Sequence, residues 1–196
     1  AQNLGALNNA GDLYVNLNGA QDASLIQAES LNNANGAYLF LGNHANFSQQ
    51  GGKAVNRGEI YVQGLDALAD TQISFADLDN AGGILNIDWA KLNFANSFNN
   101  TGKLNALNDA EIKAGNLKNA GEINLYNSSI AAVNLENNNA IKASGTAKIQ
   151  ASNAIQNNKL IHAKGDLYLD AKTLKNAEKS GIIALNNLRS EEHTSE

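Results

Sequence analysis

The nine residues LKNAGEINL, at positions 117–125, determine how the rest of the chain is interpreted. A Leu is followed by Asn119 and Gly121, and two further apolar residues, Ile123 and Leu125, then alternate with polar ones. Alternation with a period of two is typical of a strand with one buried face. The segment therefore predicts a short strand that is preceded by a corner containing Asn and Gly.

The same unit recurs from residue 7 to residue 188. Its anchoring Asn occurs nine times, at intervals of 18 to 24 residues. The nine residues are Asn9, Asn33, Asn56, Asn80, Asn100, Asn119, Asn137, Asn157 and Asn176. An internal repeat of this length indicates a repeat architecture, which grows along one axis and has no fixed domain count.

The repeat predicts an all-β chain. Helical spacing is not sustained anywhere, and a unit of about twenty residues holds two or three short strands but not a strand with a crossover helix. We therefore expect residues 1–188 to form a right-handed parallel β-helix, or β-solenoid, of about nine coils without caps. At about 4.8 Å between coils, the shaft would be roughly 43 Å long.

Asn supplies about a sixth of all residues, and this excess needs a structural cause. A corner is expected to need left-handed backbone angles, which Gly adopts freely and Asn adopts more readily than other residues. Stacked Asn side chains can also form a hydrogen-bonded amide ladder along the axis. The nine repeated Asn residues are therefore predicted to be a structural corner ladder.

The first three coils are about four residues longer than the later ones. The excess falls in two polar segments, residues 42–52 and 64–72, which we interpret as bulging corners. Because loops accept insertions without disturbing a sheet, these corners are the segments where local recognition is most easily accommodated. The alternative is that they are merely longer turns.

Composition excludes several classes of function. The net charge is −5 and the basic residues are scattered, which argues against a nucleic-acid partner. No run of about 18 apolar residues is present, so no membrane-spanning helix is expected. The chain has no Cys, and therefore no disulfide framework or thiolate metal site.

The first and the last residues of the sequence both differ from what a complete repeat array would show. The sequence begins in mid-pattern without Met, so we interpret it as an internal fragment of a longer protein. Residues 189–196, RSEEHTSE, break the repeat abruptly and match the translation of a common sequencing adaptor. We interpret them as a non-native tail.

The repeated unit resembles the haemagglutinin repeats of filamentous haemagglutinin-like exoproteins, most clearly over residues 98–125 and 155–176. The resemblance covers residues 7–188 and implies a β-helical rod that is secreted to the bacterial cell surface by two-partner secretion. It implies an outer-membrane translocator barrel as partner during export, and receptors or glycans on a host or neighbouring cell as later partners. Such rods act as adhesins or as shafts of contact-dependent growth-inhibition toxins.

A carbohydrate-active enzyme is the alternative interpretation, because parallel β-helices also host polysaccharide lyases and hydrolases. Glycoside hydrolysis needs two carboxylates at a defined separation. Asp77 and Asp79 alternate onto one face of an expected strand, and Asp66 and Asp70 lie nearby. We interpret these residues as solvated, and the only Arg before residue 189, Arg57, as part of a corner.

Metal binding and sugar stacking find little support in the spacing of residues. His44 and His162 belong to coils six steps apart, roughly 29 Å, which is too far to share an ion. The candidate aromatic platforms are spread over many coils, and we interpret them as surface stacks or core fillers: Tyr14, Tyr38, Tyr61, Trp89, Tyr126 and Tyr168. We therefore expect no catalytic site, metal or cofactor, and a structural shaft or adhesive segment instead.

Overall fold

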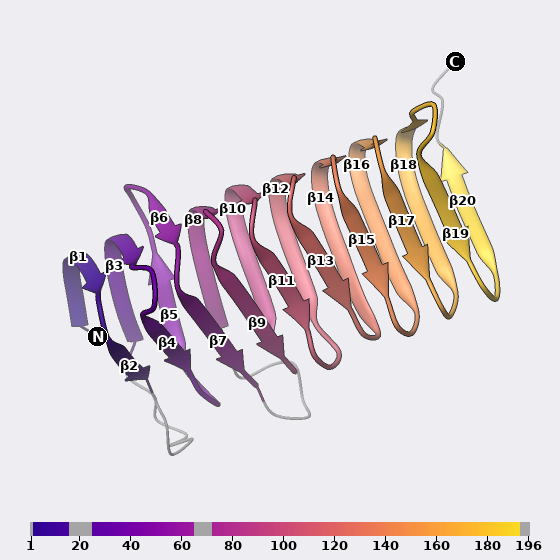
Figure 1. The fold of residues 1–196 in the computed structure, drawn as a ribbon. Helices are drawn as coiled ribbons and strands as arrows, with labels where there is room; N and C mark the ends of the chain where they lie inside the picture. Colours follow the sequence, from indigo (N-terminus) through magenta and orange to yellow (C-terminus); the bar gives the residue numbers. More distant parts are fainter. Residues whose placement is uncertain (1, 16–24, 65–71, 193–196) are drawn as a thin grey trace.

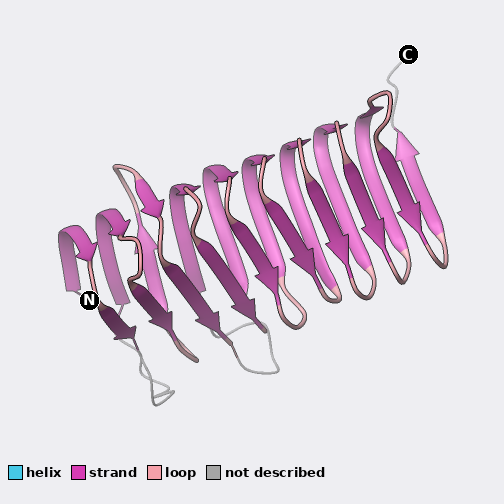
Figure 2. Cartoon of the chain, in the orientation of Figure 1, coloured by secondary structure: helices cyan, strands magenta, loops and turns pink. Residues whose placement is uncertain are grey.

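The structure is a computed structural model that describes residues 2–15, 25–64 and 72–192. In these ranges the chain forms strands and no helix, which confirms the all-β prediction (Figure 2). The strands are β1 (Gln2–Asn9), β2 (Asp12–Val15), β3 (Leu25–Asn33), β4 (Tyr38–Leu41), β5 (Asn46–Gln49), β6 (Ala54–Asn56), β7 (Glu59–Gln63), β8 (Gln72–Asn80), β9 (Ile84–Asp88), β10 (Lys91–Asn100), β11 (Lys103–Ala106), β12 (Glu111–Asn119), β13 (Glu122–Leu125), β14 (Ser128–Asn137), β15 (Ala140–Ala143), β16 (Ala147–Asn157), β17 (Leu160–Ala163), β18 (Leu167–Asn176), β19 (Gly181–Ala184) and β20 (Leu188–Glu192).

The strands form two parallel sheets that run side by side along one axis. Sheet A has the order β1-β3-β5-β8-β10-β12-β14-β16-β18-β20, with β6 beside β3 and β8. Sheet B has the order β2-β4-β7-β9-β11-β13-β15-β17-β19. Each coil contributes a strand to sheet A and then one to sheet B, and the two termini lie at opposite ends (Figure 1). The prediction of a parallel β-solenoid of about nine coils is confirmed.

One apolar core runs between the two sheets for the length of the described coils. Ile123 and Leu125 of β13 are 0% and 3% exposed, as their alternation with polar residues predicts. Phe75 and Phe94 stack with ring centroids 5.6 Å apart, and Phe94 lies 4.5 Å from Phe98. Since burying one such side chain stabilises a fold by about 1.5–3 kcal/mol, stacking of coil on coil supplies the stability that no single coil has.

One of the two expected reasons for Asn at the corners, its tolerance of left-handed backbone angles, is wrong. Each of the nine repeated Asn residues is the last residue of a sheet A strand, and none has a positive φ. The non-Gly residues with positive φ are instead His44, Trp89 and Lys179 within the described ranges. The repeated Asn is therefore selected for what its side chain does and not for its backbone conformation.

Close contact between coils, and not backbone freedom, explains most of the corner glycines. Gly102 and Gly121 do not have positive φ. A Cβ atom on Gly121 would lie 2.0 Å from the carbonyl oxygen of Gly102, and a Cβ on Gly102 would lie 2.0 Å from that of Gly83. At these two coils the corner thus rests directly on the backbone of the preceding corner, and a side chain at Gly102 or Gly121 would collide with it.

Gly121→Ala is therefore expected to destabilise the protein by about 1–3 kcal/mol, because the added methyl group must push two coils apart. Gly11→Ala is the matched control, since a Cβ there has no atom within 4 Å and φ is not positive. Urea unfolding of both variants measures the difference. Equal stabilities would contradict the close-contact explanation.

The structure corrects the interpretation of residues 42–52 as a bulging corner. Residues 46–49 form β5, which pairs with β3 and β8 inside sheet A. Phe47 is 0% exposed, and the buried Gln49 donates from Nε2 to the carbonyl oxygens of Glu29 and Gly52 at 2.8 and 2.7 Å. Only the short excursion between β5 and β6 leaves the sheet (Figure 1). The other predicted corner spans residues 64–72, of which residues 65–71 lie outside the described ranges, and Gln72 is the first residue of β8.

The segment interpreted as a tail begins in the last strand. β20 pairs with β18 so that Arg189 and Ser190 lie opposite Tyr168 and Leu169. Ser190 is exposed at the register position where β18 has the buried Leu169, so the inward apolar pattern ends here. The interpretation of residues 189–196 as non-native stays a prediction, because one added strand can pair through its backbone alone.

Candidate functional site

The structure brings all nine repeated Asn residues into one continuous ladder. In each of the eight successive pairs, Nδ2 of one Asn donates to Oδ1 of the Asn one coil further on, at 2.8 Å. Seven of the nine side chains are at most 1% exposed; Asn9 is 8% exposed and Asn176 is exposed. The ladder is therefore buried along most of its length. All of its side-chain hydrogen bonds donate in the same direction, toward the C-terminal end of the solenoid.

The second hydrogen of each amide is also used. Asn100 Nδ2 donates to the carbonyl oxygen of Glu122 at 3.0 Å, and Asn119 Nδ2 donates to that of Ala140 at 3.2 Å. Equivalent bonds occur along the ladder, each to the first residue of the sheet B strand one coil further on. Asn fits because a neutral amide has two donors and an acceptor on one short side chain, whereas Asp has no donor when ionised.

The backbone beside the ladder forms a parallel set of bonds. The N–H of Ala120 donates to the carbonyl oxygen of Asn100 at 2.8 Å, and the N–H of Asn138 donates to that of Asn119 at 2.7 Å. Side-chain bonds therefore run toward the next coil while these backbone bonds run toward the preceding one. Together they hold neighbouring corners from both sides and leave the polar groups of the ladder satisfied.

Two further amide columns were missed by the sequence interpretation. On the outer face of sheet B, Asn124 donates to Asn105 and Asn105 to Asn86, at 3.0 and 2.9 Å. Within sheet A, a second exposed column on β16, β14 and β12 joins Asn153, Asn134 and Asn116 at 2.7 and 2.8 Å. Their spacing of 18 or 19 residues equals that of the later repeats, so a search for recurring Asn at any position of the unit could have found them.

The two candidate carboxylates that the structure describes, Asp77 and Asp79, have different surroundings. Asp79 is exposed on β8, and Asp77 accepts hydrogen bonds from Ser97 Oγ at 2.5 Å and Asn96 Nδ2 at 3.0 Å. These bonds lower the pKa of the Asp77 carboxyl group, whereas a general acid needs a raised pKa. Asp66 and Asp70 lie outside the described residues. Asp77 is thus a hydrogen-bond acceptor that ties β8 to β10.

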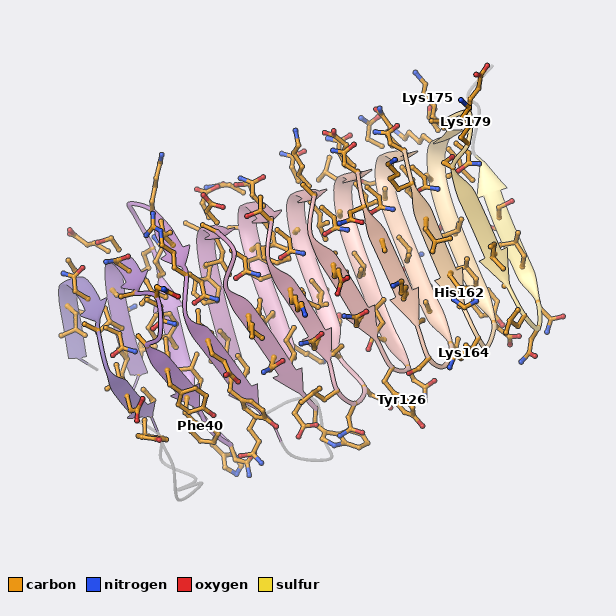
Figure 3. The ribbon with its side chains drawn as sticks, viewed as in Figure 1. Phe40, Tyr126, His162, Lys164, Lys175 and Lys179 are labelled. Carbon is orange, nitrogen blue, oxygen red and sulfur yellow. The ribbon has the colours of Figure 1, made fainter. Side chains whose placement is uncertain are left out.

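The structure keeps the candidate histidines apart and places Arg57 at a corner. His44 lies between β4 and β5, and His162 lies on β17, six strands further along sheet B (Figure 3). In residues 2–15, 25–64 and 72–192, no three His, Cys, Asp or Glu residues form a group that could hold a metal. Arg57 Nη1 donates to Asn32 Oδ1 at 3.3 Å.

The described surface has several hollows that are open to solvent. One of about 320 Å³ lies over the corners of three successive coils and is lined by Tyr38, Arg57, Glu59 and glycine backbone. Another, of about 240 Å³, lies at the C-terminal end beside Tyr168 and Asp170. The geometry therefore favours contact with an extended surface over enclosure of a substrate.

With this geometry in place, the chain was compared with known proteins. Protein-family models, curated proteins and solved structures give no match. Within the ranges that the structure describes, no helix is long and apolar enough to cross a bilayer.

Asn119→Ala tests the ladder. The substitution leaves Asn100 Nδ2 without its side-chain acceptor, and it removes the donor to Asn137 Oδ1 and to the carbonyl oxygen of Ala140. We expect a loss of roughly 2–4 kcal/mol in unfolding free energy, because buried polar groups lose their partners. Asn99→Ala, at an exposed position beside the ladder, should change stability by less than about 0.5 kcal/mol. Similar urea midpoints would refute the ladder's role.

Proposed function

We propose that the chain is a shaft segment of a large exoprotein that is secreted to a bacterial cell surface. The observation that carries the proposal is the uninterrupted ladder of buried Asn residues, which links every coil to the next at one depth in the core. A rod of this kind holds a distal element at a fixed distance. It needs no catalytic centre.

The resemblance of the repeat to those of filamentous haemagglutinin-like exoproteins supports the cellular setting. Under this proposal the chain crosses the outer membrane through a dedicated barrel and folds outside. Its role would be to present an adhesive or toxic element to another cell, and to contribute adhesion itself. Parallel pairing between successive coils suits such export, because each coil packs on one that has already formed.

A shaft has to be rigid, and spin labels can measure this directly. Asn8 and Lys175 are exposed and occupy one column of sheet A, eight coil steps apart. Because the chain has no Cys, Asn8→Cys with Lys175→Cys gives a uniquely labelled pair. Pulsed electron–electron double resonance should show one narrow distribution of spin–spin distances centred near 38 Å, lengthened only by the linkers of the labels.

The control pair is Asn8→Cys with Lys118→Cys, five coil steps apart, which should give about 24 Å. Broad distributions, or distances that do not scale with the number of coils, would exclude a rigid spacer. Measurable cleavage of a pectin-like or other polysaccharide by the purified chain would instead favour the enzyme interpretation.

A further inference from the structure

Four aromatic side chains gather on the outer face of sheet B over its first three strands. Tyr14 of β2, Phe40 of β4 and Tyr61 of β7 occupy one register column, and Tyr38 lies beside them on β4. Ring centroids of neighbours are 5.8 to 6.4 Å apart. Phe40 marks the group in Figure 3. We call these four residues the aromatic patch.

The most exposed ring of the aromatic patch has an open face. Tyr14 is 49% exposed. Its ring meets Tyr38 at 60° and Phe40 at 46°, so neither neighbour covers it in parallel stacking. Phe40 and Tyr61, in contrast, stack at 21° and support one another. The patch thus combines a fixed aromatic base with one ring that can stack on a ligand.

Hydrogen-bonding groups continue the same column. Tyr61 lies opposite Asn86, which is followed by Asn105 and Asn124. Asn86 donates from Nδ2 to Glu59 Oε1 at 2.8 Å and accepts at Oδ1 from Asn105 Nδ2 at 2.9 Å, so each amide retains hydrogen-bonding capacity toward solvent. The hollow of about 320 Å³ is lined by Tyr38, Glu59 and Ile84, which form a separate register column two residues earlier on the same strands.

The negative charge of this part of the chain disfavours an anionic ligand at the aromatic patch. Residues 1–90 contain nine Asp and Glu but only two Lys and Arg. Glu59 and Asp88 lie within the group itself, since Glu59 binds Asn86 and Asp88 accepts from the Tyr61 hydroxyl at 3.4 Å. An acidic surface repels sulfated or phosphorylated ligands.

The size of the aromatic patch argues against a protein partner. A stable protein interface buries about 800 Å² on each side. A complete aromatic side chain offers about 150–250 Å², and Tyr38, Phe40 and Tyr61 are already partly buried. The patch therefore suits a narrow ligand that extends along the amide column.

We propose that the aromatic patch and the amide column of Asn86, Asn105 and Asn124 bind an uncharged glycan chain laid along the solenoid axis. Tyr14 stacks against the C–H face of a sugar ring, because the negative ring face attracts polarised C–H groups. The amides exchange hydrogen bonds with hydroxyl groups at successive coils. This binding is separate from the shaft role, which requires no ligand.

Native affinity electrophoresis tests the proposal. The intact chain is run in gels that contain hydroxyethyl cellulose, laminarin or galactomannan, with heparin as the anionic control. At least one neutral polysaccharide should retard the chain, and heparin should not. Tyr14→Ala and Phe40→Ala should each raise the dissociation constant about tenfold.

Tyr168→Ala is the matched control, because Tyr168 is a 38% exposed aromatic residue on the outer face of sheet A. It should retain wild-type retardation, and unchanged circular dichroism should show that all three variants are folded. The proposal is overturned if no neutral polysaccharide retards the chain, if heparin retards it more, or if Tyr168→Ala loses as much affinity. It is also overturned if Tyr14→Ala abolishes a concentration-dependent dimer, which would make the patch a contact for a second copy. None of these results alters the spin-label distances.

Discussion

The amide hydrogen bond between Asn residues of successive coils is the interaction on which the structure depends. Apolar columns alone specify the inward face of a strand but tolerate slippage by two residues, because the next alternate residue is apolar too. A buried amide has no such freedom, since a shifted Asn would lose two donors and an acceptor inside the core. The 2.8 Å bonds from Asn9 to Asn176 therefore set the register of both sheets.

The ladder and the corner glycines both help to set the distance between neighbouring coils. Each repeated Asn ends a strand of sheet A, and at some corners the Gly two residues later rests against the preceding corner, as Gly121 rests on Gly102. The amide draws the coils together while the missing side chain permits the approach. This arrangement leaves the outer faces of the sheets free to vary, so a face such as that around Tyr14 and Phe40 can carry recognition without weakening the rod.

The fold could be predicted from the sequence because two features recur along the repeats. One is an Asn at the same position of each unit, and the other is the alternation of apolar with polar residues, as at Ile123 and Leu125. The stacking of the Asn side chains in a ladder was predicted as well, whereas their expected left-handed backbone conformation was wrong, because each of these Asn residues ends a strand. β5 escaped prediction because the inward-facing Gln49 interrupts its apolar pattern. The aromatic patch was not predicted because the coils that carry Tyr14 and Phe40 differ in length, so a fixed sequence spacing does not show that the two residues share a column.

Hydrogen exchange at the side-chain amides tests the central claim most directly. Two-dimensional NMR of the chain, labelled with ¹⁵N and transferred to D2O, separates the buried ladder amides from exposed ones such as Asn99. The ladder account predicts that the Nδ2 hydrogens of Asn56, Asn100 and Asn137 exchange only through opening of the coil stack, and slowly, while those of Asn99 exchange at once. Rapid exchange at the ladder positions in a folded chain would contradict it.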